Sequence, residues 1–261
     1  MQIKYSNQEV IKDAMSLRDL ILTNNPGIIK VKPRVLLSLI EKKYKNPVKI
    51  NFQLPSSEIG SITTLEGAML VALIKLLNPE KIFEFGTYLG YTTSLLLENS
   101  NAHVYSIDLP GEKSDFFKDD FFDRNIILQN DEYNDKFLTA RAVSTGPYYL
   151  KFSIENSKLH LIKQNSLNFI PASFQLEKQT DFIFIDGGHT LAIITSDTNQ
   201  SLKMISERGL IAWHDFSSAL HTKVSEFLIN FSRSNQILHI ESTMLALGGP
   251  GLKQFFGKVL E

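Results

Sequence analysis

The chain has 261 residues, of which 43% are apolar and 21% charged, so it can bury one substantial core. Its 27 basic and 28 acidic residues give a formal charge of −1, which provides no general attraction to nucleic acid or to an anionic membrane. The chain contains no cysteine, which excludes disulfides, thiolate metal sites and cysteine nucleophiles. The first residues lack the layout of a signal peptide, and no apolar run approaches the roughly 20 residues of a membrane span. We therefore expect a single globular unit in the cytoplasm, with neither nucleic acid nor a membrane as its partner.

Helical patterns occupy the N-terminal part of the chain. Apolar residues recur at three- and four-residue spacing over Glu9–Thr23 and Arg34–Tyr44, which predicts two amphipathic helices. A third pattern runs from Thr64 or Leu65 to Leu77 and stops before an Asn-Pro pair. We expect residues 1–62 to form a helical cap on an α/β core that spans 63–261, with the third helix packed against its sheet.

Five short apolar runs follow, each bounded by polar or turn residues, which is typical of buried parallel strands. These runs are Lys81–Phe85, His103–Ile107, Leu159–Lys163, Asp181–Ile185 and Leu210–Trp213. Helical patterns at Leu191–Ile205 and Leu220–Asn230 follow the fourth and fifth runs, as right-handed crossovers require, and Gly209 suits the end of the first helix. The stretch from Gln236 to Leu247 is typical of an antiparallel pair. The sequence therefore predicts a doubly wound, mostly parallel sheet of seven strands that ends in an antiparallel pair.

An insertion separates the second apolar run from the third. It covers residues 109–158, far more than a usual crossover needs. Its segment Asp115–Asp123 interleaves phenylalanines with charges, and Gly146–Tyr149 adds two tyrosines. Two interpretations stay open: a lid or substrate wall, and an amphipathic helix anchored by Phe117 and Phe121 whose acids are simply solvated.

A strand, a glycine turn and a second strand that ends in a carboxylate form the most informative motif. Gly86 lets the backbone approach a ligand, a helix over Thr92–Asn99 presents its amide end, and Asp108 lies where ribose hydroxyls would sit. The Gly-x-Gly-x-x-Gly pattern of dinucleotide-binding proteins is absent, because Tyr88 and Tyr91 occupy its second and third glycine positions. The motif predicts a site for a nucleoside other than a dinucleotide.

Carboxylates and imidazoles follow the next two predicted strands. Asp186 and His189 come after the fourth apolar run, and His214 and Asp215 after the fifth. Neighbouring parallel strands lie about 4.8 Å apart, so these side chains can share one crevice. The two carboxylates suit a hard divalent cation such as Mg²⁺, with His214 as a further ligand. Helix capping or loop hydrogen bonds for the two acids, and packing beside Trp213 for His214, stay open as alternatives.

Across these motifs the chain resembles the class I S-adenosylmethionine methyltransferases, and among them the metal-dependent small-molecule O-methyltransferases. The branch that it resembles includes macrolide-sugar and aminocoumarin-sugar methyltransferases, with caffeoyl-CoA and catechol O-methyltransferases as more distant relatives. The resemblance runs from about Ser61 to Leu247 and rests on Thr64-Leu-Glu-Gly67, Glu84–Thr92, Asp108, Gln164-Asn165-Ser166, Ile185–His189 and Trp213-His-Asp215. It implies a Rossmann-like fold and S-adenosylmethionine as the cofactor.

The resemblance also implies roles for single residues. The implied cofactor-binding residues are Glu84, Gly86, Thr87, Tyr88, Gly90, Thr92, Asp108, Asn165, Ser166 and Asp186. Among them, Glu84 and the glycines would shape the methionine end of the pocket, Asp108 would bind the ribose, and Asn165 and Ser166 would lie at the adenine. The implied metal ligands are Asp186, Asp215 and His214, and the implied catalytic residues are His189, as the base, with Asp186 and His214.

Two positions depart from the family pattern. Asn165 stands where the family usually has an aspartate, but an amide still donates and accepts hydrogen bonds around an adenine ring. His214 stands where sugar-modifying relatives usually have an acid, and the loss of a negative ligand weakens or alters the metal site. We therefore expect cofactor binding to be retained despite Asn165. Because of His214, the resemblance implies metal dependence less directly than it implies cofactor binding.

The expected reaction is methyl transfer from S-adenosylmethionine to a hydroxyl of a small molecule, either a sugar or a catechol-like acceptor. A cation at Asp186 and Asp215 would lower the pKa of the hydroxyl, and His189 would take its proton. Three alternatives remain: a metal-free methyltransferase that relies on His189 or His214, a non-catalytic nucleoside-binding protein of the same fold, and a nicotinamide-dependent oxidoreductase, which the missing glycine pattern disfavours. Apolar faces on the N-terminal helices suit either a homo-oligomer interface or core packing.

Overall fold

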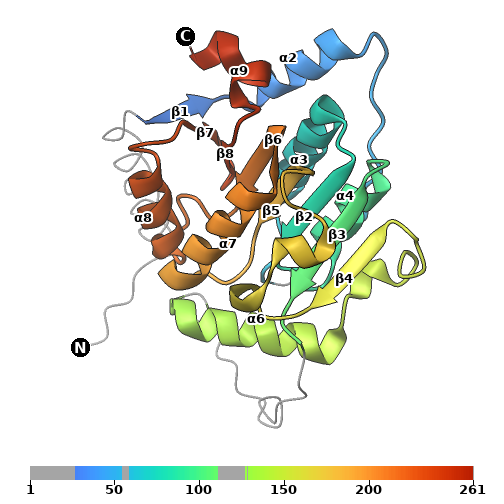
Figure 1. The fold of residues 1–261 in the computed structure, drawn as a ribbon, viewed down its shortest axis with the longest axis vertical. Helices are drawn as coiled ribbons and strands as arrows, with labels where there is room; N and C mark the ends of the chain where they lie inside the picture. Colours follow the sequence, from blue (N-terminus) through green and yellow to red (C-terminus); the bar gives the residue numbers. More distant parts are fainter. Residues whose placement is uncertain (1–26, 55–58, 111–126, 128, 261) are drawn as a thin grey trace.

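The computed structural model describes residues 27–54, 59–110, 127 and 129–260, and its centre is an eight-stranded sheet (Figure 1). The strands lie in the order β1-β7-β8-β6-β5-β2-β3-β4, and β8 alone runs antiparallel to its neighbours. Their bounds are β1 Ile28–Val31, β2 Lys81–Phe85, β3 His103–Asp108, β4 Leu159–Lys163, β5 Thr180–Ile185, β6 Ile205–Trp213, β7 Ile237–Ile240 and β8 Ala246–Gly248. The predicted fold class, a doubly wound and mostly parallel α/β sheet with an antiparallel pair near the C-terminal end, is confirmed.

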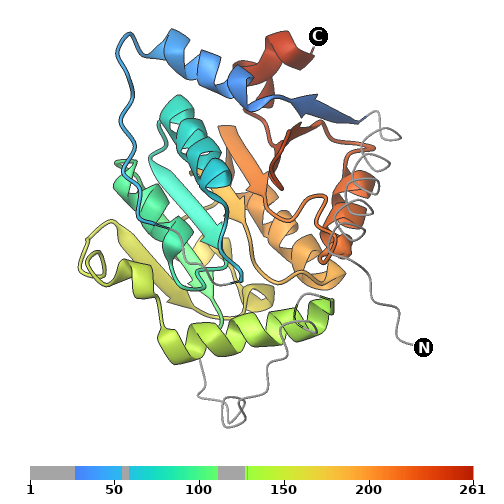
Figure 2. The ribbon, with the colours of Figure 1, turned by 180° about the vertical axis from the view of Figure 1, so that it is seen from behind.

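Helices cover both faces of this sheet. Their bounds are α2 Pro33–Lys43, α3 Thr64–Leu77, α4 Tyr91–Glu98, α6 Asp131–Thr145, α7 Leu191–Met204, α8 Thr222–Phe231 and α9 Leu252–Leu260, with 3₁₀ turns η2 Tyr148–Leu150, η3 Ser166–Asn168 and η4 Pro171–Phe174. Helices α7 and α8 lie on the face seen in Figure 1, α3 and α4 lie on the face seen in Figure 2, and α6 crosses one end of the sheet. Among these described elements, no helix combines the length and apolar character that a membrane span requires.

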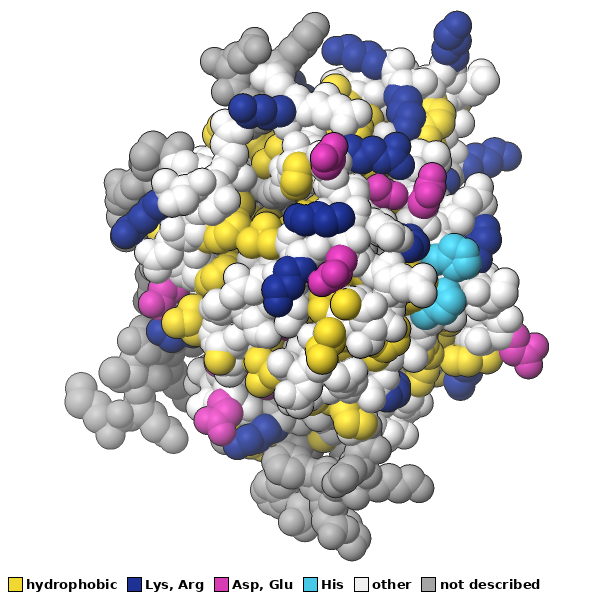
Figure 3. Space-filling model, viewed as in Figure 1, with side chains coloured by type: hydrophobic (Ala, Val, Ile, Leu, Met, Phe, Trp, Pro, Cys, Tyr) yellow, Lys and Arg dark blue, Asp and Glu magenta, His cyan; other side chains and the backbone are white. Residues whose placement is uncertain are grey.

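Alternation of side chains along β5 shows why the strands are apolar throughout. Phe182 and Phe184 point into the hydrophobic cluster formed with α3 and α4, whereas Ile183 and Ile185 point into the opposite cluster with α7 and α8. All six residues of this strand are buried, because helices cover both faces of a parallel sheet. Basic and acidic side chains both appear across the molecular face in Figure 3, as the near-zero formal charge leads one to expect.

Helix α3 begins with reciprocal hydrogen bonds that also connect it to a distant loop. The Thr63 hydroxyl accepts a 3.3 Å hydrogen bond from the backbone N–H of Glu66, and the Thr63 N–H donates back to Glu66 Oε2 at 2.8 Å. The other oxygen of Glu66 accepts a 2.7 Å hydrogen bond from the backbone N–H of Met244, just before β8. One buried carboxylate therefore fixes the start of a central helix against the antiparallel end of the sheet.

A second buried carboxylate, Glu84, lies on the central strand β2. Glu84 Oε2 accepts hydrogen bonds from the Ser106 hydroxyl, at 2.6 Å, and from the Thr93 hydroxyl. Its other oxygen, Oε1, has no hydrogen-bond partner among the described residues. Burial, reinforced by the charges of Asp186 and Asp108, raises the pKa of Glu84 to about 8. This acid is therefore protonated in the folded protein at neutral pH.

The N-terminal part of the fold differs from the prediction. The stretch Ile28–Val31, expected within the helical cap, forms β1 and pairs in parallel with β7, with Ile28 opposite Ile237. Four residues are too few to show a periodicity, and the partner strand is distant in sequence. The predicted helix at Arg34–Tyr44 is confirmed as α2, whereas the one at Glu9–Thr23 lies outside the described residues.

Two details of the C-terminal half were predicted incorrectly, namely the place of Gly209 and the start of the fifth apolar strand, which is Ile205 rather than Leu210. One segment cannot be compared. Gly209 lies within β6 rather than at the end of α7, which stops at Met204. The pairing of β5 with β6 shifts register where Thr180 is opposite Ile205 and Phe182 opposite Leu210. This irregularity allows the strand to start directly after the helix, without the glycine cap that the sequence suggested. The aromatic segment 115–123 lies outside the described residues, and the division into cap, core and insertion stays a prediction.

Leu73 and Leu65 of α3 offer a matched test of the core. Leu73 is fully buried against the sheet, whereas Leu65 is 38% exposed on the same helix. Replacement of Leu73 by Ala should lower the free energy of unfolding by about 2–5 kcal/mol, because it removes buried apolar atoms and leaves a cavity. The same change at Leu65 should lower the free energy of unfolding by well under half of that amount. Urea unfolding of both variants measures the difference, and equal losses would contradict the described packing of α3.

Glu84 generates a prediction about pH. Its pKa is about 8 in the folded protein and roughly 4.3 in an unfolded chain, so the folded state binds more protons between these values. The stability contributed by this group is therefore complete below the unfolded pKa and is lost as the pH rises toward 8, by at most about 1.4 kcal/mol per pH unit. Replacement by Gln should flatten that slope of the unfolding free energy. Denaturant unfolding across this range checks it, and identical slopes in both proteins would rule out a neutral Glu84.

Candidate functional site

A cavity of about 390 Å³ opens at the carboxyl ends of β2, β3, β5 and β6. Strand β2 has β3 on one side and β5 on the other, so the sheet changes direction of winding here. Ligands bind at such a crevice in open α/β sheets. Helix α6 supplies the facing wall through Asn134, Asp135 and Leu138. The insertion therefore takes part in building this cavity.

The turn after β2 brings two strand ends into close contact. Gly86 has a φ of +94°, and a Cβ at this position would lie 2.0 Å from the carbonyl oxygen of Asp186. Only glycine fits here, because any side chain would collide with the backbone of the β5 loop. Tyr88 also has a positive φ, of 46°, and its N–H donates a 2.9 Å hydrogen bond to Asp108 Oδ2. The glycine turn, the end of β3 and the end of β5 therefore form one continuous wall.

Asp108 faces this cavity from the end of β3. Besides the Tyr88 N–H, it accepts a 2.8 Å hydrogen bond from the backbone N–H of Leu109 at Oδ1. Burial raises the pKa of Asp108, and the nearby Lys163 and the two backbone donors oppose that shift. The side chain is thus held in one orientation, with acceptor oxygens available at the cavity wall.

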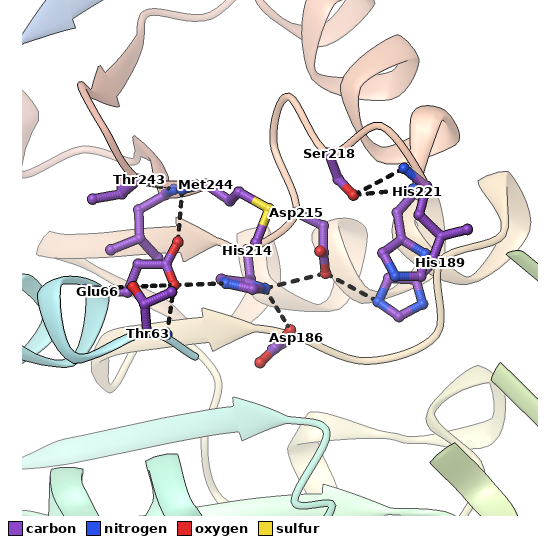
Figure 4. Close-up of polar contacts among 12 residues, drawn as sticks. Thr63, Glu66, Asp186, His189, His214, Asp215, Ser218, His221, Thr243 and Met244 are labelled. Carbon is purple, nitrogen blue, oxygen red and sulfur yellow. Dashed lines mark hydrogen bonds and ion pairs between the residues drawn. The ribbon is translucent and has the colours of Figure 1, made fainter. Parts of the chain in front are cut away.

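His214 lies between carboxylates at the end of β6 (Figure 4). Its Nδ1 is 3.1 Å from Asp186 Oδ1 and 3.2 Å from Asp215 Oδ2, and its Nε2 is 3.5 Å from Glu66 Oε2. Burial opposes the charge of the ring, but Asp186 and Asp215 outweigh burial and hold the pKa of His214 well above its usual value. For Asp215 the converse holds: burial would raise its pKa, and the imidazoles of His214 and His189 lower it well below the usual value. The cluster is therefore a buried imidazolium compensated by carboxylates.

His189 has carboxylates at both ring nitrogens. Its Nδ1 is 2.5 Å from Asp135 Oδ1 on α6, and its Nε2 is 3.0 Å from Asp215 Oδ2. Burial would lower the pKa of His189, but Asp215 and then Asp135 raise it to about 10. The predicted base is thus brought into the cavity as expected, and there it already carries a proton at neutral pH.

His221, which the sequence analysis did not select, completes the imidazole group. It precedes α8 and lines the cavity, and its ring stacks on His189 with centroids 3.5 Å apart and an angle of 19°. Its Nδ1 is 2.5 Å from Asp131 Oδ1, one helical turn from Asp135 on α6. Acids four residues apart lie on one face of a helix, but nothing in the sequence connects that face to these histidines.

Among the described residues, two groups of side chains place ligand atoms within 4.8 Å of one another. The first joins Asp186, His189 and Asp215, two carboxylates and one imidazole, which suit a divalent cation once the imidazole has given up its proton. His214, predicted as a ligand, is not in this group and instead contacts both acids through Nδ1.

The second group joins the paired residues of α6 and the stacked imidazoles, namely Asp131, Asp135, His189 and His221. Because the two rings are nearly parallel, the lone pairs of their Nδ1 atoms do not converge on a single point. This group is therefore better described as two parallel aspartate–histidine pairs than as a chelating site.

The cavity gathers most of the predicted residues. It is lined by Gly86, Thr87, Tyr88, Thr92, Asp108, Asp186, His189, His214 and Asp215. Glu84 lies behind the turn, and Gly90 is the residue that precedes α4. Asn165 caps η3 by accepting a 3.0 Å hydrogen bond from the Leu167 N–H, and Ser166 lies beside Asp197. These last two do not line the cavity, and their place at an adenine stays a prediction.

Comparisons with known proteins agree with this geometry. The sequence profile of a family described as "Methyltransferase domain" matches residues 83–216, just over half of the chain. No protein of curated function matches the chain in sequence. Among solved structures, the methyltransferase PaMTH1 of Podospora anserina, bound to S-adenosylhomocysteine, is 13% identical, with 95% of this chain and 97% of that chain covered and a TM-score of 0.50.

Two further structures are similar at lower scores. A putative caffeoyl-CoA O-methyltransferase from Staphylococcus aureus is 16% identical, covers 90% of this chain and 97% of its own, and has a TM-score of 0.47. The O-methyltransferase TomG from Streptomyces achromogenes, in complex with S-adenosylmethionine, is 14% identical over 82% of this chain and 89% of its own, with a TM-score of 0.44.

The family profile decides the assignment, because identities this low among solved structures show the fold alone. Its matched span contains the glycine turn, Asp108 and both strand ends that carry Asp186 and Asp215. The chain belongs to this methyltransferase family and is a class I S-adenosylmethionine-dependent methyltransferase.

Proposed function

We propose that this methyltransferase transfers the methyl group of S-adenosylmethionine to a hydroxyl oxygen of a small molecule, assisted by a divalent cation held at Asp186 and Asp215. One observation carries the proposal. The carboxylates of these residues and the imidazole of His189 lie within 4.8 Å of one another, in the same cavity as Gly86 and Asp108. The groups proposed to bind the cofactor and the groups proposed to activate the hydroxyl therefore lie in the same cavity.

The cofactor half of the site follows from the chain's own geometry. The absence of a side chain at Gly86 lets the turn after β2 pack against the backbone of Asp186 at the cavity wall, and Asp108 offers acceptor oxygens to a ribose diol. Thr92 lines the cavity in the first turn of α4, where backbone N–H groups are free to meet a polar ligand. Asn165 and Ser166 are proposed to approach the adenine after movement of η3.

The acceptor half needs a nucleophilic oxygen. The sulfonium of the cofactor is already a good leaving group, so the protein has to align the acceptor and assist removal of its proton. Asp186 and Asp215 would hold a divalent cation, which would supply Lewis acidity that lowers the pKa of the acceptor hydroxyl. His214 holds the two carboxylates from behind, and His189 fixes Asp215 from the opposite side. The donor set is thus oriented by side chains that are themselves hydrogen-bonded.

A metal-independent methyltransferase is the second candidate, and a specific observation favours it. His214 Nδ1 lies within 3.2 Å of both carboxylates, so an internal imidazolium already compensates their charge without any ion. In that case alignment and proton transfer by the chain's own residues would carry the reaction. Chelation separates the two candidates.

Cofactor binding provides the first test. Replacement of Asp108 by Asn should weaken binding of S-adenosylhomocysteine by about 10- to 100-fold, because it removes a charged acceptor from the ribose site. Calorimetric titration measures the affinity, with NAD as the control ligand and Glu155→Gln, an exposed acid, as the control variant. If NAD bound and S-adenosylhomocysteine did not, the proposed cofactor site would be wrong.

Metal dependence provides the second test. Treatment with EDTA should lower kcat for methyl transfer to catechol or a methyl glycoside by at least about tenfold, and added Mg²⁺ should restore it. Asp215→Asn should be slow both with EDTA and with Mg²⁺, because it lacks one of the carboxylates proposed to bind the cation. Binding of Mn²⁺, followed by electron paramagnetic resonance, gives a readout that does not depend on turnover. Full activity in EDTA, with no Mn²⁺ bound, would favour the metal-independent reaction.

A further inference from the structure

We propose that His221 is the base that accepts the proton of the acceptor hydroxyl, with Asp131 as its positioning residue. The proposal rests on the O-methyl transfer proposed above and names a residue for its proton-transfer step. Neither residue belongs to the motifs that the sequence analysis selected. Both are brought to the cavity by the fold, His221 from the segment before α8 and Asp131 from the first turn of α6.

The geometry at His221 is that of an oriented base. Its Nδ1 lies 2.5 Å from Asp131 Oδ1, so this nitrogen carries the hydrogen that is donated to the carboxylate. When the ring is neutral, its lone pair is then on Nε2, and no hydrogen bond or ion pair joins that atom to a described residue. The backbone N–H of His221 also donates to the Ser218 hydroxyl at 3.2 Å, which fixes the residue at its own backbone (Figure 4). A base held by a carboxylate at one nitrogen, with the other nitrogen free, is the arrangement that proton abstraction requires.

His189 does not offer such a nitrogen. Both of its ring nitrogens contact carboxylates, Asp135 at 2.5 Å and Asp215 at 3.0 Å. An incoming hydroxyl would have to displace one of these contacts before it could reach the ring. The stacking of His221 on His189, with centroids 3.5 Å apart, instead makes His189 a platform that restricts rotation of the His221 ring. His189 therefore positions the ring of His221, and His221 accepts the proton.

His214 is excluded as the base by the same reasoning. Its Nδ1 is shared between Asp186 and Asp215, and its Nε2 faces Glu66 at 3.5 Å, away from the open part of the cavity. Among the described histidines that line the cavity, His221 is the one with a ring nitrogen that no carboxylate contacts.

The step balances without any further reactant. The O–H bond of the acceptor breaks and its proton passes to Nε2 of His221, while the oxygen forms a bond to the methyl carbon. The carbon–sulfur bond of the cofactor breaks, and its electron pair stays on the sulfur, which becomes a thioether. The positive charge of the sulfonium is thus replaced by an imidazolium, which Asp131 stabilises at 2.5 Å through Nδ1. Solvent then takes the proton from the ring before the next turnover.

The test compares three variants of the full chain. In His221→Ala, kcat for methyl transfer to catechol or a methyl glycoside should fall about 10²- to 10⁴-fold, while the affinity for S-adenosylhomocysteine stays unchanged. His221→Gln should be equally slow, because it preserves the size of the side chain and a hydrogen bond to Asp131 without a basic nitrogen. In Asp131→Asn, kcat should fall less, by roughly tenfold, because the base is still present but poorly oriented. Lys223→Ala, an exposed residue in the first turn of α8 that does not line the cavity, serves as the control and should be nearly as active as the parent chain.

Chemical rescue distinguishes a base from a structural residue. Added imidazole should restore part of the activity of His221→Ala, and substituted imidazoles of higher pKa should restore more at equal occupancy. The larger side chain of His221→Gln leaves no space, so this variant should not respond. A His221→Ala enzyme that keeps kcat within about threefold, or that is slow and insensitive to every imidazole, overturns the assignment. A parent chain that binds S-adenosylhomocysteine and methylates no hydroxyl acceptor overturns the proposed O-methyl transfer itself, and the base with it.

Discussion

The imidazole of His214, enclosed by the carboxylates of Glu66, Asp186 and Asp215, is the constraint on which the rest of the site depends. Glu66, His214 and Asp215 are buried, whereas Asp186 is partly exposed. Buried charged groups are stable only when they are paired, so the three buried side chains hold one another in place. Glu66 also caps α3 and holds the loop before β8 through the N–H of Met244. The start of a helix, the ends of two parallel strands and the antiparallel end of the sheet are thereby fixed to one another around a single ring.

This cluster forms one side of the cavity, and the Gly86 turn forms the other. The backbone of that turn lies against the carbonyl of Asp186 at a distance that no side chain would permit. Asp186 therefore has two fixed neighbours, the turn on its backbone side and His214 on its carboxylate. In a methyltransferase the reacting atoms have to be aligned, and these contacts fix the position of Asp186 between the glycine turn and His214.

Helix α6 forms the wall of the cavity that faces the ends of the strands. Asp131 and Asp135 lie one turn apart, and each holds the Nδ1 of one of two stacked imidazoles. The sheet thus supplies the glycine turn and the two acids at which we propose that a cation binds, while α6 orients the imidazoles of His189 and His221. In the proposed reaction, changes in α6 would alter proton transfer at His221 and leave the glycine turn in place.

The sequence by itself determined the sheet and most of the cavity. The apolar run Lys81–Phe85 is a strand with those same bounds, because burial on both faces requires continuous apolar residues. Leu159–Lys163 also keeps its predicted bounds, at the edge of the sheet, where Ile162 is its buried residue. Polar residues directly after such runs must meet at the carboxyl edge, so Asp186 and Asp215 were found together. Only the tertiary structure decided the contacts between segments that share no local pattern. Strand β1 depends on pairing with β7, and the ring of His221 depends on Asp131, 90 positions earlier. Neither the register of distant strands nor the partner of a lone histidine is encoded in local spacing, because packing of the whole chain selects them.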